Sequence, residues 1–330
     1  MDGDGVIYLV VGNKHAEHVV VSLFSLRKHW TGDVAILVGD QAAEELCAPM
    51  ASLPRTRLIR FDYASLNINK RGSGNTYLAK SSMHRFSPFD RTVFLDADTL
   101  VVGDIGPIFP AAGWVNITSW MDWVSTGKMM SGRITGWRDY APQEVARQLE
   151  RPWPAINTGV IGFTKDSHET MEAWHAMTKR NVCFICDEIA MQLIFPDYWC
   201  NVLDDRFNAS PCYPEQWRRH GYSAEAIEEL DRYCVGLNGE SVRVVSDDKL
   251  QLMLDISRAR TQPGDVRVWH GHGMKFFKKP LGRAVWWPVY REAVAENFCG
   301  IADWSPWNRT PGRFKRCKFL SYVNNPRQWQ

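Results

Sequence analysis

The hydrophobic pattern of the first hundred residues alternates between two periods. Runs of apolar and β-branched residues predict strands, whereas apolar positions three to four residues apart predict helices. Strands are expected at residues 6–11, 33–38, 57–60 and 91–95, and helices at residues 15–29, 41–48 and 75–86. Strands that alternate with helices are typical of parallel βαβ units. The pattern therefore predicts an α/β fold with a mainly parallel central sheet flanked by helices.

The pattern becomes irregular in residues 112–155. This segment is rich in Trp, Gly and Ser, and only residues 143–149 suit a short helix. Long irregular segments in compact enzymes are often lids or substrate loops. The alternative is a structural insertion anchored by its tryptophans, and the sequence leaves both open.

Regular elements return further along the chain. A strand is expected at residues 155–163, helices at 166–179 and 187–195, and a strand at 266–270, with weaker apolar segments at 242–245 and 250–254. We therefore expect one domain over residues 1–280, with the segment 112–155 as an insertion. Residues 281–330 are rich in Trp, Pro and basic residues and are expected to pack on that domain as an extension.

Composition narrows the class of protein. The chain has 330 residues, 45% hydrophobic and 23% charged, with a net charge of +2, which predicts a folded core and gives no sign of nucleic-acid binding. No apolar run is long enough for a transmembrane helix and the first residues do not resemble a signal peptide, so a cytoplasmic location is expected. The eight cysteines are scattered, and Cys183 and Cys186 are expected to be core thiols.

Two carboxylates follow the strand expected at residues 91–95, in the sequence Asp96-Ala97-Asp98. At the end of a strand they can point to one spot beyond the sheet edge, where ligands of α/β sheets bind. Hard carboxylate oxygens suit Mn²⁺ or Mg²⁺, and such an ion often also binds substrate phosphates. A turn or helix cap is the alternative use of these aspartates. Their position after a buried strand favours the metal site.

Several other motifs occur in a characteristic order. They are Leu9-x-Val11-Gly12-Asn13-x-His15, Lys80, Phe94-Leu-Asp96-Ala97-Asp98, Asn157-Thr158-Gly159, Asp187-Glu188 and His270-x-x-Gly273-x-Lys275. This set resembles glycosyltransferase family 8, which includes glycogenin and bacterial galactosyltransferases. The resemblance implies a GT-A fold and a metal-dependent glycosyltransferase. Such an enzyme would move a sugar, expected to be a hexose from a UDP-sugar donor, with retention of the anomeric configuration.

The resemblance also implies roles for individual residues. The donor nucleotide and its sugar would contact Leu9, Val11, Gly12, Asn13, His15, Lys80, Asp96, Ala97, Asp98, Asn157, Thr158, Gly159, Gly273 and Lys275. Asp96, Asp98 and His270 would hold the metal, and an imidazole ligand favours Mn²⁺ over Mg²⁺. His272 is an alternative third ligand. The acceptor would be a carbohydrate, glycan or protein, and a homodimer is left open.

The chain departs from that family in two places. Lys275 comes five residues after His270 rather than six, so Lys278 and Lys279 are alternatives. Glu188 follows Asp187 where the family usually has Gln. Asp187 is expected to bind donor sugar hydroxyls. Glu188 could attack as a nucleophile, which Gln cannot do, could stabilise developing positive charge, or could only cap a helix.

Two other functions use similar features. A nucleotidyltransferase also combines paired aspartates with an α/β sheet, but it usually has a Gly-rich basic loop after the first strand, and residues 11–15 make a poor phosphate cradle. A non-catalytic carbohydrate-binding protein could keep the scaffold without the chemistry. The intact pair of Asp96 and Asp98 argues against that second alternative.

Overall fold

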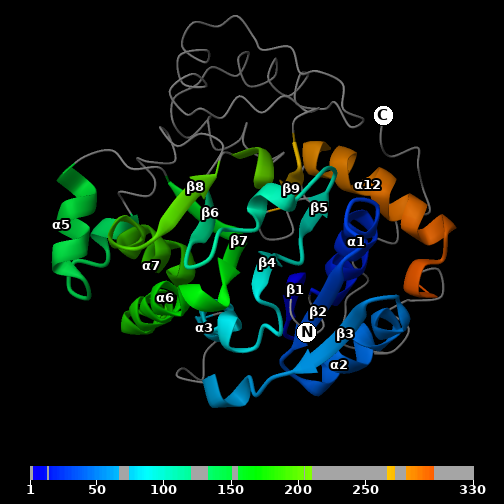
Figure 1. Cartoon of the computed structure of the whole chain (residues 1–330), viewed down its shortest axis with the longest axis horizontal. Coiled ribbons are helices and arrows are strands. Elements are labelled where there is room, and N and C mark those ends of the chain that lie inside the picture. Colours follow the sequence, from blue (N-terminus) through cyan, green and yellow to red (C-terminus); the bar gives the residue numbers. More distant parts are fainter. Residues whose placement is uncertain are drawn as a thin grey trace, which may run out of the picture.

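The computed structural model describes residues 3–12, 15–66, 74–119, 133–150, 155–203, 205–209, 266–271 and 280–300. Within these residues a central sheet is covered by helices on both faces (Figure 1). The weak apolar segments at 242–245 and 250–254 lie outside the described residues, as do Asn13, His272, Gly273, Lys275 and most of the expected C-terminal extension.

The sheet has seven strands in the described part of the chain. Their order is β3 (Thr56–Arg60), β2 (Asp33–Val38), β1 (Asp4–Val10), β4 (Arg91–Leu95), β7 (Ile156–Thr164), β6 (Val115–Ser119) and β8 (Cys200–Leu203). Strands β3, β2, β1 and β4 are parallel neighbours, and β7 runs antiparallel to both β4 and β6. A separate two-stranded sheet pairs β5 (Thr99–Val101) with β9 (Val268–His270).

Alternate residues of the buried strands face two helical layers. Along β1, Val6, Tyr8 and Val10 pack on one side and Ile7 on the other, as the period of two along a strand requires. The first layer contains α1 (Ala16–Arg27), α2 (Gln41–Cys47) and α12 (Pro280–Ala295). The second contains α3 (Gly74–Ser81), α5 (Pro142–Glu150), α6 (His168–Arg180) and α7 (Cys186–Ile194). This layering confirms the predicted fold class.

Three details differ from the sequence prediction. Strand β6 lies inside the sheet at the start of the segment expected to be an irregular insertion, and β8 pairs beside it. The helix expected to reach residue 86 ends at Ser81, and a 3₁₀ turn, η3 (Met83–Arg85), follows. The hydroxyls of Ser81 and Ser82 donate to the carbonyls of Leu78 and Ala79, a local alternative to helical continuation.

Helix α5 covers the short helix expected at residues 143–149. Cys47, Cys183, Cys186, Cys200 and Cys299 are free thiols. None of the described helices has the length and apolar character needed to cross a membrane.

Candidate active site

The two aspartates after β4 are held by a tight turn between two sheets. The backbone N–H of Asp96 donates to the carbonyl of Gly159 on β7 (2.8 Å), and the carbonyl of Asp96 accepts from the backbone N–H (3.1 Å) and hydroxyl (2.8 Å) of Thr99. Thr99 pairs with His270 in the small sheet, and the N–H of Gly271 donates to the carbonyl of Asp98 (2.7 Å). Strand pairing therefore brings His270 to both carboxylates.

Asp96, Asp98 and His270 form a cluster with the geometry of a metal site. Their ligand atoms lie within 4.8 Å of one another. Nε2 of His270 is 3.2 Å from Oδ1 of Asp98 and 3.5 Å from Oδ2 of Asp96. Two carboxylates and one imidazole are suitable ligands for a divalent cation such as Mn²⁺.

Asn208 fixes the orientation of the His270 ring. Its amide nitrogen donates to Oδ1 of Asn157 and to the hydroxyl of Thr118, each at 2.7 Å. These two acceptors leave Oδ1 of Asn208 facing Nδ1 of His270, at 2.8 Å, so Nδ1 is assigned as the donor. The lone pair of Nε2 then faces Asp96 and Asp98, as a metal ligand requires.

Lys80 on α3 places a positive charge between two carboxylates. Its Nζ lies 2.9 Å from Oδ2 of Asp96 and 3.4 Å from Oδ2 of Asp187. Burial lowers the pKa of Lys80, but these carboxylates outweigh the burial and raise the pKa above its ordinary value. Burial also raises the pKa of Asp96, against the opposing effect of Lys80. Lys80 therefore stays charged.

Asp187 has one satisfied and one unsatisfied carboxylate oxygen. Oδ2 accepts from the hydroxyl of Thr158 at 2.6 Å, in addition to its contact with Lys80. Oδ1 is buried and has no hydrogen-bond partner among the described residues. An unpaired buried acceptor costs free energy, so this oxygen has the character of a ligand-binding group.

Glu188, the next residue on α7, is held by two polar side chains. Nδ2 of Asn157 donates to Oε1 at 2.7 Å, and Nη1 of Arg133 lies 3.3 Å from Oε2. Burial, reinforced by the neighbouring Asp187, raises the pKa of Glu188 to about 7, although Arg133 acts in the opposite direction. Both ionisation states are therefore accessible near neutral pH.

The Asn157-Thr158-Gly159 motif lies on a strand, which confirms the strand expected at residues 155–163. All three residues lie within β7, where Asn157 pairs with Thr118 of β6 and the carbonyl of Gly159 accepts from the backbone N–H of Asp96. The register between β6 and β7 shifts between Ile117 and Thr118, which leaves Thr158 and Gly159 outside the paired positions. The motif residues contact Glu188, Asp187 and His270 respectively.

The residues expected to bind the nucleotide base lie at the end of β1. Leu9 and Val11 pack partly buried against the core. Gly12 has a φ of +66°, which favours glycine, and its N–H donates to Oδ2 of Asp40 at 2.6 Å. The ring of His15 lies 6.3 Å from that of His18. Ala97 is buried between the two candidate metal-binding aspartates.

Three residues of this site were not predicted from the sequence. Arg133 contacts Glu188, whereas Asn208 and Thr118 support His270 and Asn157. Arg133 and Asn208 lie in segments with no clear periodic pattern. Thr118 belongs to an apolar–polar alternation, Val-Asn-Ile-Thr-Ser, that would have indicated strand β6.

Comparisons with known proteins identify the fold. No known protein family matches the chain, and no curated protein matches its sequence. Mouse xyloside xylosyltransferase 1 matches with a TM-score of 0.52 and 16% identity, over 83% of this chain and 99% of that chain. The galactosyltransferase LgtC, solved in complex with donor and acceptor sugar analogs, matches with a TM-score of 0.54 and 15% identity, over 92% and 97%.

A third solved structure is the glycosyltransferase GlyE of Streptococcus pneumoniae. It matches with a TM-score of 0.52 and 14% identity, over 90% of this chain and 64% of that chain. The protein therefore has the α/β fold of these glycosyltransferases, which confirms the predicted GT-A type fold. At these identities the likeness concerns the fold alone.

Proposed function

We propose that this protein is a metal-dependent glycosyltransferase that moves a hexose from a UDP-sugar to an acceptor with retention of configuration. The observation that carries the proposal is the cluster of Asp96, Asp98 and His270 beside Lys80. The cluster lies where β4 ends, the edge at which α/β sheets bind nucleotides. The fold shared with glycosyltransferases supports this assignment, and the ordered motifs favour glycosyltransferase family 8.

The ligand set fits a divalent metal ion. Asp96, Asp98 and His270 would hold Mn²⁺ or Mg²⁺, and Asn208 keeps the correct nitrogen of His270 directed at the site. When bound, the ion would offset the negative charge that develops on the departing diphosphate. Lys80 adds a second, permanent positive charge from the protein.

Asp187 and Glu188 are suited to the sugar. The unpartnered Oδ1 of Asp187 can accept a hydrogen bond from a donor hydroxyl, while Thr158 and Lys80 hold Oδ2. Glu188 presents a carboxylate held by Asn157 and Arg133. We assign it the stabilisation of positive charge at the anomeric carbon, because both of its oxygens already contact hydrogen-bond donors.

The nucleotidyltransferase alternative is disfavoured by the turn after β1. A phosphate cradle would direct free backbone N–H groups at an anion. Here the N–H of Gly12 donates to the carboxylate of Asp40, which occupies that donor and repels a phosphate. The turn is therefore better suited to a neutral nucleotide base than to a phosphate chain.

A donor-hydrolysis assay tests the proposal. UDP-glucose, UDP-galactose and UDP-xylose, with ATP as the comparison, would be incubated with metal-free protein and with Mn²⁺ added. We expect Mn²⁺-dependent release of UDP from at least one sugar donor and no pyrophosphate from ATP. Pyrophosphate release would favour nucleotidyl transfer, whereas no UDP binding with or without Mn²⁺ would favour a non-catalytic protein.

A further inference from the structure

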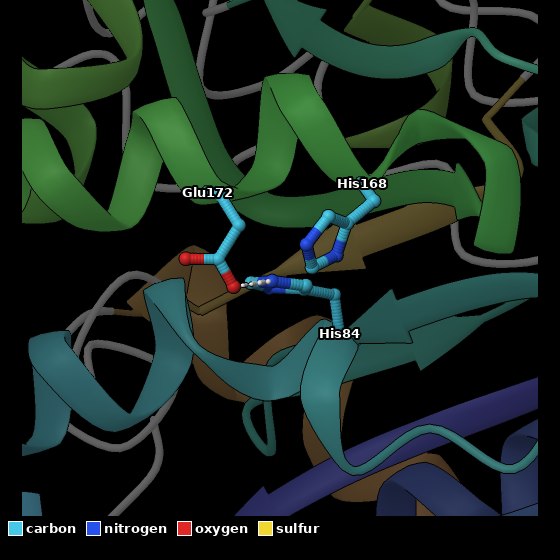
Figure 2. A group of neighbouring side chains, drawn as sticks. All are labelled: His84, His168 and Glu172. Atoms are coloured by element: carbon cyan, nitrogen blue, oxygen red, sulfur yellow. Dashed lines mark hydrogen bonds and ion pairs between the residues drawn. The ribbon is translucent and has the colours of Figure 1, made fainter.

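A second group of metal-ligating side chains lies outside the candidate active site. His168 and Glu172 are four residues apart at the start of α6, so they lie one turn apart on the same face of the helix. His84, from the 3₁₀ turn η3, meets them across the interface between the two elements. Figure 2 shows the three side chains converging from the helix above and the turn below.

The distances bring one ligand atom from each residue together. The three atoms lie within 4.8 Å of one another. Nε2 of His84 is 2.8 Å from Oε1 of Glu172, and the rings of His84 and His168 have centroids 5.6 Å apart. His84 is almost buried, with 5% of its side chain exposed, whereas His168 faces solvent. The cluster is thus anchored at one side and open to an ion at the other.

The hydrogen bonds among these side chains do not satisfy every polar atom of the cluster. One nitrogen of His84 contacts Glu172, and Nδ1 is buried without a partner among the described residues. Two imidazoles and one carboxylate are the protein ligands of many zinc sites, in which water completes a tetrahedron. The set differs from Asp96, Asp98 and His270, whose two carboxylates suit a harder ion.

We propose that His84, His168 and Glu172 form a second metal site, selective for Zn²⁺ or a similar transition metal. The ion would link α6 to η3, the turn that follows α3, and α3 carries Lys80. Its role would be structural, because it would fasten two packed elements rather than contact the donor. Binding to the folded state alone would raise thermal stability by mass action.

Arg85 competes with a metal ion for the carboxylate of Glu172. Its guanidinium binds Glu172 through two contacts, Nε to Oε1 at 2.7 Å and Nη2 to Oε2 at 2.5 Å. A bound ion must share the carboxylate with this positive charge, which weakens the site. Removal of the charge in Arg85→Gln should therefore tighten Zn²⁺ binding, an effect opposite to that of losing a ligand.

The test uses tag-free, metal-stripped full-length protein carrying Asp98→Ala, so that the candidate active site does not also bind the ion. Calorimetric titration with ZnCl₂ should show one equivalent bound. Adding His168→Ala should weaken binding at least tenfold, and adding Arg85→Gln should strengthen it several-fold. His29→Ala is the matched control, because His29 is an exposed histidine of α1's C-terminal flank, outside both clusters.

Thermal unfolding gives an independent measurement. Zn²⁺ should raise the melting temperature of the Asp98→Ala protein and of its His29→Ala derivative, but not of the His168→Ala derivative. His168 is exposed, so its replacement should not itself unfold the chain. Equal Zn²⁺ affinity with and without His168→Ala, or no binding in the Asp98→Ala protein, would overturn the proposal while leaving the glycosyltransferase assignment untouched.

Discussion

Gly159 lies directly against the imidazole ring of His270. A Cβ placed on Gly159 would lie 2.1 Å from Cε1 and 2.5 Å from Nδ1 of that ring. Real side chains do not approach so closely, so a residue other than glycine at this position must displace His270 or the strand. Gly159 therefore makes room for the proposed metal ligand, a role separate from the sugar contact implied by the family resemblance.

Gly159→Ala should impair the metal site more than the fold. Overpacking of a buried position commonly costs about 1–3 kcal/mol of stability. Displacement of His270 should weaken Mn²⁺-dependent UDP binding at least tenfold, which is about 1.4 kcal/mol. Calorimetry would measure the affinity and circular dichroism the fold. Gly136→Ala is the control, since its Cβ would meet only the carbonyl oxygen of Arg133, at 3.4 Å; equal UDP affinity in both variants would contradict the predicted displacement.

Asp98→Ala should abolish the metal-dependent part of UDP binding. The substitution removes one of three ligands and leaves Asp96 and His270 too few to hold the ion tightly. Titration of UDP with Mn²⁺ and with EDTA measures the two parts separately. Asp104→Asn, at an exposed aspartate six residues further along, should retain the difference between the UDP affinities in Mn²⁺ and in EDTA. Identical UDP affinity in Mn²⁺ and EDTA for the wild-type protein would falsify the assignment of this cluster.

Asp187→Ala should reduce turnover much more than UDP affinity. The unpartnered Oδ1 is expected to accept a bond from the sugar rather than from the nucleotide. We expect donor hydrolysis to fall about a hundredfold, as for the loss of one well-placed polar contact. Thr158→Val is the companion variant, because it removes the hydroxyl that donates to Oδ2, leaves the contact of Oδ2 with Lys80, and should have a milder effect. A parallel fall in UDP affinity and turnover would place Asp187 at the nucleotide instead.

The sequence predicted the parts of this site that follow strand ends. Asp96 and Asp98 follow a strong apolar run and His270 ends another, which marks all three as strand-end residues, although their meeting depends on the pairing of β5 with β9. Strand β8 was missed because it is only four residues long and carries a polar residue, whereas the alternation in β6 was overlooked within the irregular composition of residues 112–155. Short strands depend on neighbours for stability, and a single sequence does not show those neighbours.

The supporting residues illustrate a different limit. Asn208 contacts three side chains from β6, β7 and β9, which lie 51 to 90 residues away in the chain. Arg133 meets Glu188 across 55 residues. No local pattern records such pairings, because they arise only when the sheet is assembled. Hydrogen-bond partners of a site are therefore harder to predict than the ligands themselves.

Glu188 should make stability depend on pH. Its pKa is raised from the ordinary 4.5 to about 7, so near neutral pH the folded state keeps a proton that the unfolded chain has lost. The protein should therefore lose stability as pH rises from 4.5 to about 7, by about 3 kcal/mol, and change little from this group above that range. Glu188→Gln should remove this slope in denaturant unfolding, whereas Glu169→Gln, on the exposed face of α6, should keep it.

Glu188→Gln also separates the two chemical roles of this carboxylate. Oε1 of Glu188 accepts from Asn157, and Oε2 lies beside Arg133. These contacts lower the nucleophilicity of the Glu188 carboxylate, and a Gln side chain can keep part of them. If Glu188 stabilises positive charge, the variant should retain donor hydrolysis within about tenfold, because a neutral carbonyl dipole still faces the anomeric carbon. A nucleophile would instead be lost, with a fall of more than about a thousandfold.

If Glu188 were a nucleophile, mass spectrometry of wild-type protein quenched during turnover would detect a glycosyl adduct on Glu188. We expect no adduct, and NMR of the transferred sugar should show the anomeric configuration of the donor. An inverted product would contradict the retaining mechanism whichever role Glu188 has.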